Sequence, residues 1–216
     1  MDLFKLIGQL GSGMVISVEI FVLTLLFSLP LGLVISFGRM SKNTLLRSIT
    51  KVYISLMRGT PLMLQLMVVY FGPYYLFGIK ISASYRFTAV IVGFALNYAA
   101  YFAEIYRSGI QSMPVGQYEA AKVLGYSRMQ TFFKIILPQV VKRILPPVTN
   151  EVITLVKDTS LAFVIAVSEM FTTAKAVAAA QTTMVPFIVA AVFYYIFNFA
   201  VAAFMEYLEK KLEYYK

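Results

Sequence analysis

Residues 119–138 read EAAKVLGYSRMQTFFKIILP. This stretch is polar and basic along most of its length, yet long hydrophobic segments precede and follow it. Segments of about 20 apolar residues are long enough to cross ~30 Å of hydrocarbon. The pattern therefore predicts a membrane protein that holds a structured piece of chain at one membrane face, an arrangement suited to docking.

The composition of the 216-residue chain is that of an integral membrane protein. Hydrophobic residues make up 60% of it and charged residues only 13%, which is too apolar for a soluble domain of this length. The net charge of +9 is explained by basic loops beside a membrane, so no nucleic acid is expected as a partner. The sequence has no cysteine and no histidine. Histidine is the commonest general base and the commonest transition-metal ligand. Because the sequence has none, neither an enzyme nor a metal site is expected.

The hydrophobic segments predict an all-α integral membrane protein of one domain, residues 1–216, with about five transmembrane helices. An interfacial segment is expected over residues 1–12, and an amphipathic helix on the membrane surface is expected over residues 39–58. Short outer loops are expected over residues 78–85 and 171–184. The five spans are expected at residues 14–38, 61–77, 86–107, 147–170 and 185–207.

Lysine and arginine are distributed unequally between the predicted loops. Fourteen of the 19 lie in the segments 39–58, 107–143 and 210–216. Four lie on the other side, and Lys157 lies inside a span. Because basic loops stay in the cytoplasm, the N-terminus is expected outside and the C-terminus in the cytoplasm, which agrees with an odd number of spans.

The cytoplasmic connection over residues 108–143 carries helix signals and does not have the composition of a linker. Pro114 suits the start of a helix, and Gly125 suits the left-handed position that ends one. Ser127 and Gln130 form a capping-box pattern that opens a second helix. The sequence therefore predicts two short helices joined by a sharp turn.

Three further residues shape the interpretation of this loop. Pro138 is expected to interrupt the second helix. Ala120 and Ala121 are small, so another surface can approach closely there. We interpret the loop as a docking site, with a structured loop that has no partner as the alternative.

Polar residues inside the predicted spans mark a candidate substrate site. Asp158 lies about ten residues into its span, ~15 Å deep, where a charge costs about 2.5–3.5 kcal/mol unless it faces a cavity or a partner. Asn97, Tyr101 and Glu104 recur at helical spacing and share one face of another span. The pattern predicts that these four residues line a cavity for a small zwitterion or cation, whose ammonium or guanidinium group faces a carboxylate.

Other roles for these charged residues stay open from the sequence. Glu104, Glu151, Lys157 and Asp158 could pair among themselves and only hold the helices together. Glu104 and Asp158 could also be ion ligands of an ion-coupled secondary transporter or channel for a small cationic solute, which leaves the basic loop unexplained. An intramembrane enzyme would need the two carboxylates about 5 Å apart or closer.

The spacing within the opening stretch resembles a known motif. Glu119-Ala120-Ala121, three residues, Gly125, nine residues, Ile135, one residue and Leu137-Pro138 match the EAA loop of ABC importer permeases without a gap. Other stretches resemble the polar amino-acid uptake family, most of all its permeases for basic amino acids (arginine, histidine, lysine). These stretches are RGTPL (58–62), AEIYRSGI (103–110), GQYEAA (116–121) and KDTSL (157–161).

The resemblance implies a type I ABC importer permease fold in a bacterial cell membrane. It implies that Glu119, Ala120, Ala121 and Gly125 belong to a coupling helix in the groove of a separate ATPase subunit, which holds the ATP and magnesium. A second, identical permease subunit and an extracytoplasmic solute-binding protein that supplies the amino acid are also implied. No cofactor is expected in this chain, because Met14 follows its N-terminal glycines where a P-loop requires lysine.

Overall fold

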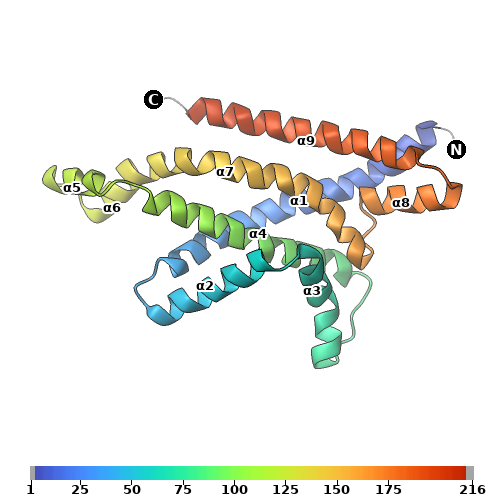
Figure 1. The fold of residues 1–216 in the computed structure, drawn as a ribbon, viewed down its shortest axis with the longest axis horizontal. Coiled ribbons are helices and arrows are strands. Elements are labelled where there is room, and N and C mark those ends of the chain that lie inside the picture. The colour runs from blue at the N-terminus through green and yellow to red at the C-terminus, as the bar shows by residue number, and fades with distance from the viewer. Residues whose placement is uncertain (1–2, 213–216) are drawn as a thin grey trace.

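The computed structural model describes residues 3–212, and all regular secondary structure in this range is helical. Figure 1 shows α1, α4, α7 and α9 running along the long axis of the molecule, with α5 and α6 at one end and α8 at the other. The helices are α1 (Leu3–Arg39), α2 (Thr44–Gly59), α3 (Leu62–Phe77), α4 (Tyr85–Gln111), α5 (Val115–Val123), α6 (Arg128–Gln130), the π-helix η1 (Thr131–Ile136), α7 (Leu137–Asp158), the 3-10 helix η2 (Thr159–Ile165), α8 (Met170–Gln181) and α9 (Val185–Leu212).

Three of these helices, α1, α4 and α9, are each long and apolar enough to cross a membrane. Two further crossings result if each bent pair of helices is counted as one span. One pair is α2 with α3, which meet at 111°, and the other is the run from α6 to η2 with α8, bent by 58°. The architecture confirms the predicted all-α fold with three to five candidate spans, of which the fourth and fifth would each be a bent pair of helices.

The centre of the bundle is the contact between α1 and α4, where small residues let two helices approach closely. A Cβ atom added to Gly32 would lie 2.8 Å from the Cβ of Phe102 and 3.0 Å from the carbonyl oxygen of Ala99. Phe94, Tyr98 and Phe102 of α4 are buried in the main hydrophobic core beside this contact. The close approach of α1 leaves no room for a larger side chain at Gly32.

α1 is one continuous helix from Leu3, so the described part of the segment predicted as interfacial, residues 3–12, belongs to the same helix as the first predicted span. Leu6 and Leu10 are buried and pack in a cluster with Met170. Burial of these side chains outweighs the low helix propensity of the glycines between and after them.

Most of residues 171–184 form helix α8 and not the predicted outer loop. The buried Glu169 carboxylate accepts hydrogen bonds from the backbone N–H groups of Phe171 and Thr172, each at 2.7 Å. A carboxylate at this position caps a helix N-terminus and suits its dipole. The span predicted over residues 147–170 is not one straight α-helix, because α7 ends at Asp158 and the 3-10 helix η2 follows it.

α2 forms the helix predicted over residues 39–58 and packs one side on the bundle. It contacts α1 and α4, and the Tyr53 hydroxyl donates a 2.5 Å hydrogen bond to the carbonyl oxygen of Leu96, near the middle of α4. An amphipathic pattern also suits a helix that packs one face on a bundle and exposes apolar residues such as Ile49 and Val52 on another. The end of α2 therefore reaches the centre of the molecule, where α3 turns away (Figure 1).

Candidate functional site

A cavity of about 440 Å³ lies between the end of α2, the second half of α4 and α7. Its walls include Arg58 from α2, Tyr101 and Glu104 from α4, and Arg143 and Glu151 from α7. Two of the four residues predicted from the sequence, Tyr101 and Glu104, therefore line one cavity. The volume falls in the range of pockets that enclose small molecules, about 300–1,000 Å³.

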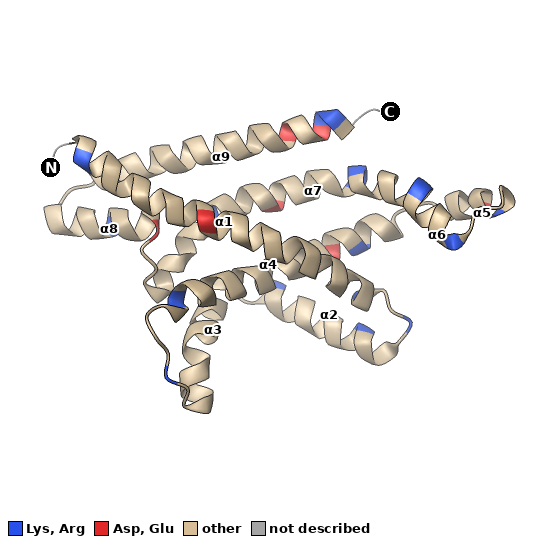
Figure 2. Cartoon of the chain, turned by 180° about the vertical axis from the view of Figure 1, so that it is seen from behind, with Lys and Arg blue, Asp and Glu red and all other residues tan. Residues whose placement is uncertain are grey.

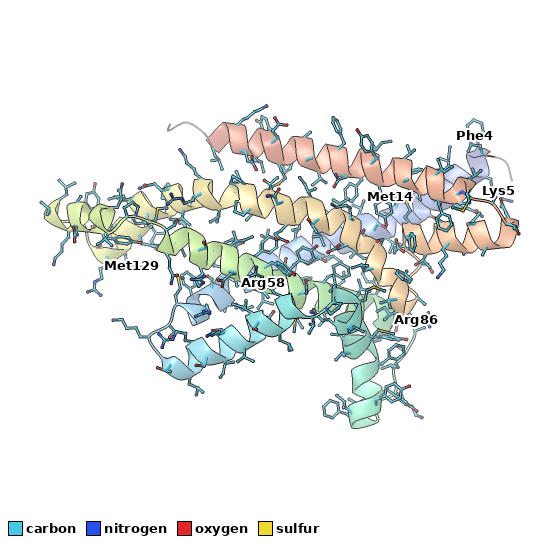
Figure 3. The ribbon with its side chains drawn as sticks, viewed as in Figure 1. Phe4, Lys5, Met14, Arg58, Arg86 and Met129 are labelled. Carbon is cyan, nitrogen blue, oxygen red and sulfur yellow. The ribbon has the colours of Figure 1, made fainter. Side chains whose placement is uncertain are left out.

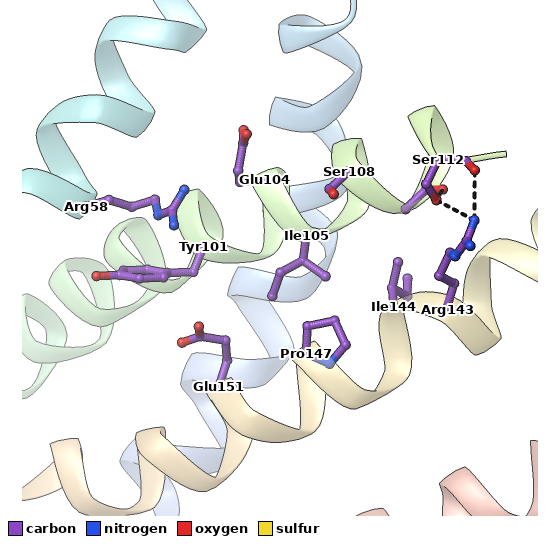
Figure 4. Close-up of a pocket in the computed structure, with 11 residues that line it drawn as sticks. Arg58, Tyr101, Glu104, Ile105, Ser108, Ser112, Arg143, Ile144, Pro147 and Glu151 are labelled. Carbon is purple, nitrogen blue, oxygen red and sulfur yellow. Dashed lines mark hydrogen bonds between the residues drawn. The ribbon is translucent and has the colours of Figure 1, made fainter.

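Opposite charges face this cavity around one aromatic ring. The guanidinium carbon of Arg58 lies 5.2 Å from the centre of the Tyr101 ring, a distance at which a cation is attracted to the ring face. Figure 4 shows Arg58 on one side of this ring and Glu151 on the other. Within residues 3–212, neither Arg58 nor Glu151 forms a hydrogen bond or an ion pair. Both charges are therefore available to a ligand.

The Glu104 carboxylate is bound by its own helix. Arg107, one turn further along α4, forms an ion pair with it, and the Arg107 Nε donates a 3.0 Å hydrogen bond to Glu104 Oε1. The pairing among Glu104, Glu151, Lys157 and Asp158 that the sequence left open is not seen among the described residues. Glu104 is a cavity-lining carboxylate that already has a cationic partner.

Asn97 and Asp158 do not line the cavity. Asn97 is buried and bonded to the α2–α3 break: its Nδ2 donates to the carbonyl oxygen of Met57 at 3.0 Å and to Gln65 Oε1 at 2.9 Å. Asp158 accepts a 2.7 Å hydrogen bond from the Tyr98 hydroxyl. This bond joins the end of α7 to α4. The structure thus separates the four predicted residues into two beside the cavity and two in contacts between helices.

The cavity wall also contains three charged residues outside the predicted site: Arg58, Arg143 and Glu151. The sequence places Arg58 and Arg143 among the charges of cytoplasmic segments and offers Glu151 only as a partner for other charges. The RGTPL stretch, residues 58–62, was the available signal for Arg58, because a proline-containing break inside a membrane protein is tolerated only where it is buried or lines a cavity.

The loop at the far end of the bundle has the local structure that its sequence predicts. α5 ends before Gly125, which has a φ of 78°, the left-handed conformation that glycine adopts at least expense. The capping box is confirmed: Gln130 N donates to Ser127 Oγ at 3.2 Å, and Ser127 N donates to Gln130 Oε1 at 2.9 Å. The second helix is not short, however, because it continues through η1 into α7 past Pro138. Pro138 directly follows the π-helical segment η1, where the Leu137 N–H donates to the carbonyl oxygen of Phe132, five residues earlier.

The surface of this loop is open on one side. Glu119, Ala120 and Gly125 are exposed, whereas Ala121 is only 1% exposed, so only one of the two alanines can meet a partner directly. Val123 and Leu124 are 87% and 73% exposed. The Gly125 turn therefore exposes two large apolar side chains, neither of which is among the four residues that the resemblance implies for coupling.

The fold and the site are those of a helical membrane protein with a charged cavity between its helices. The chain belongs to the family described as binding-protein-dependent transport system inner membrane component, which matches residues 28–214. Relatives include the probable amino-acid ABC transporter permease protein YckA of Bacillus subtilis, 45% identical over 86% of this chain and 80% of the relative. The L-cystine transport system permease protein TcyB of the same organism is 36% identical over 95% and 87%.

The fold matches a solved structure described as an amino acid ABC transporter with histidines, with a TM-score of 0.88, 30% identity and 97% of both chains covered. Further relatives are named as permeases for glutamine, arginine and octopine. The chain is therefore a permease subunit of an amino-acid ABC importer, a transport component of the type I permease fold.

Proposed function

We propose that this chain forms the translocation pathway for a basic amino acid and that the cavity beside Tyr101 is its substrate site. The observation that carries the proposal is that Arg58 and Glu151, opposite charges without a hydrogen bond or ion pair within residues 3–212, lie on the two sides of one aromatic ring. An amino acid presents a carboxylate and an ammonium group a few bonds apart. Arg58 suits the carboxylate and Glu151 suits the ammonium group.

The preference for a basic side chain rests on the second carboxylate and the ring. Glu104 lies in the same cavity, and a substrate guanidinium or ammonium group would replace Arg107 as its partner. The face of Tyr101 favours cations as well. An arginine permease is among the relatives, together with permeases for cystine and glutamine. Tyr101 and Glu104 stay proposed substrate contacts, and we assign Asn97 and Asp158 to holding the helices in place.

The loop over residues 108–143 would bind a separate ATPase subunit, which holds the ATP and magnesium. Glu119, Ala120 and Gly125 would meet it directly with the exposed Val123, while Ala121 supports α5 from inside. The proposed assembly also contains a second copy of this permease and a solute-binding protein on the opposite face. The ATPase would then act on the cavity through the continuous helical segment from α6 to α7, because α7 carries Glu151 of the cavity wall.

The orientation follows from the charges. Figure 2 shows lysine and arginine at the end of the bundle formed by α5, α6, the start of α7 and the end of α9. Because basic segments stay on the cytoplasmic side, this distribution supports an orientation with this end in the cytoplasm and the start of α1 outside. A bacterial inner membrane is the proposed location, in keeping with the family description and bacterial relatives.

The test is transport by the complex of permease, ATPase and solute-binding protein in proteoliposomes. L-arginine is expected to stimulate ATP hydrolysis and to be taken up. Glu151→Gln and Glu104→Gln should each raise the KM about tenfold or more, because each removes a charged hydrogen bond. Glu19→Gln is the matched control, since Glu19 is an exposed carboxylate of α1 outside this cavity.

Two outcomes would count against separate parts of the proposal. Stimulation by glutamine or cystine but not by arginine would refute the basic substrate and leave the amino-acid pathway in place. Wild-type KM values in both cavity variants would show that the substrate passes elsewhere.

A further inference from the structure

The break between α2 and α3 leaves one backbone carbonyl without its usual donor. In an uninterrupted helix the Met57 carbonyl oxygen would accept the N–H group four residues later, but that residue is Pro61, which has none. Two side chains replace the missing donor. Gln65 Nε2 donates to the Met57 oxygen at 2.9 Å, and Asn97 Nδ2 donates to it at 3.0 Å.

The same two side chains also bind each other and the turn. Gln65 Nε2 lies 3.1 Å from the Thr60 carbonyl oxygen and 2.8 Å from Thr60 Oγ1, and Gln65 Oε1 accepts from Asn97 Nδ2 at 2.9 Å. Pro61 supplies no N–H group, so without these side chains the Met57 carbonyl oxygen would lack its helical donor. The network therefore fixes the geometry of the break, with one member on α3 and the other on α4.

Arg58 lies between the two residues that the network holds. It directly follows Met57 and stands two positions before Thr60. Figure 3 shows it where α2, α3 and α4 meet. Its side chain lies over the Tyr101 ring at 5.2 Å and attracts the carboxylates of Glu104 and Glu151, but it forms no hydrogen bond or ion pair within residues 3–212. Because no hydrogen bond of its own fixes the guanidinium group, its position in the cavity depends on the backbone on either side of it.

We propose that Gln65 and Asn97 are positioning residues that hold Arg58 at the cavity wall and do not themselves touch the substrate. This inference rests on the proposed substrate site. It assigns Asn97 a role different from the substrate contact that its spacing with Tyr101 predicts. It also explains why the RGTP turn is paired with two amide side chains: glutamine and asparagine can donate and accept at once, as this break requires.

The geometry can be tested without any substrate. The chain has no native cysteine, so spin labels can be placed at Val52→Cys and Phe77→Cys, which are 67% and 75% exposed on α2 and α3. In the purified full-length chain in nanodiscs, Gln65→Leu or Asn97→Leu should broaden the label–label distance distribution. Asn150→Leu is the matched control, because Asn150 is exposed on α7 and makes no hydrogen bond within residues 3–212. An unchanged distribution in both variants overturns the inference.

Binding of radiolabelled L-arginine to the same preparation separates positioning from contact. Arg58→Ala and Asn97→Leu are each expected to raise the Kd about tenfold or more, the size expected for a charged hydrogen bond. The double variant should bind no more weakly than Arg58→Ala alone, because residues that act through one group are not additive. An additional loss in the double variant would show that Asn97 touches the substrate, and overturns the inference.

A failure of the proposed function has a different signature. If the wild-type chain does not bind arginine, the basic-substrate proposal fails, while the spin-label distances still decide whether Gln65 and Asn97 fix the break.

Discussion

The substrate cavity and the docking loop are built in opposite ways. The cavity is formed by side chains from three helices, with Arg58 and Glu151 far apart in the sequence, and it depends on a broken helix held by Gln65 and Asn97. The loop is one continuous stretch whose turn and caps are formed by near neighbours. Changes inside the bundle should therefore act on folding and on substrate affinity together. Changes on the loop should act on coupling alone.

Gly32→Leu tests the bundle side of this difference and should have the largest effect. An added Cβ already lies 2.8 Å from Phe102 and 3.0 Å from the Ala99 backbone oxygen. Overpacking typically costs about 1–3 kcal/mol and more where backbone must move, so the variant should fail to give a monodisperse protein in detergent. Gly8→Leu is the matched control, because a Cβ at Gly8 meets nothing within 4 Å. Equal thermal unfolding temperatures for the two variants would contradict the close contact of α1 with α4.

Val123→Asp combined with Leu124→Asp tests the loop side. Both side chains are largely exposed, so the thermal unfolding temperature of the isolated chain should stay within the scatter of surface substitutions, about ±0.5 kcal/mol. Placing two charges in an apolar interface should weaken ATPase binding by more than tenfold. Co-purification of the ATPase measures this loss. Retained ATPase with a lowered unfolding temperature would mean that the two side chains serve the fold and not the partner.

Gly125→Val should have an intermediate effect. The φ of 78° at Gly125 costs a residue with a Cβ about 1–2 kcal/mol, so the turn should be populated in its docking geometry roughly tenfold less. Amino-acid-stimulated ATP hydrolysis should fall accordingly, while the spans still insert. Gly116→Val is the control, since Gly116 lies in α5 without a positive φ and with open space around it. A similar loss in both variants would point to a general effect of bulk on the loop.

Ser127→Ala should have the smallest effect. It removes one half of the capping box, which is worth about 1 kcal/mol and corresponds to roughly fivefold in a local equilibrium. Hydrogen exchange at the Gln130 amide should speed up by that factor, and substrate affinity should not change. Ser48→Ala on α2 serves as the control, because this exposed serine makes no hydrogen bond within residues 3–212. A changed KM would contradict the separation of loop from cavity.

Features that could be predicted depend on residues close together in the chain. The Gly125 turn and the Ser127–Gln130 box follow from backbone conformation and from hydrogen bonds across three residues. The apolar lengths of α1, α4 and α9 also follow from the sequence, because hydrocarbon thickness alone sets them. These local features can be predicted without knowing which helices pack against each other.

The features that were missed depend on partners distant in the chain. Asn97 shares a helix face with Tyr101 and was expected at the substrate, yet it bonds to Met57, forty residues earlier. The sequence predicts a loop after Glu169, over residues 171–184. It folds as α8 because Glu169 caps it and α1 and α9 cover it. Neither partner can be inferred from local spacing.

By itself, the sequence determined that this chain is a helical membrane protein, that the loop around Glu119 to Gly125 is structured, and that basic charge marks one face. These properties rest on hydropathy, backbone conformation and charge, which each residue carries with it. The tertiary structure alone decided which charges share a cavity. Arg58 belongs there only because Pro61 breaks a helix in the centre of the bundle, and side chains from α3 and α4 complete the hydrogen bonds that the break leaves open.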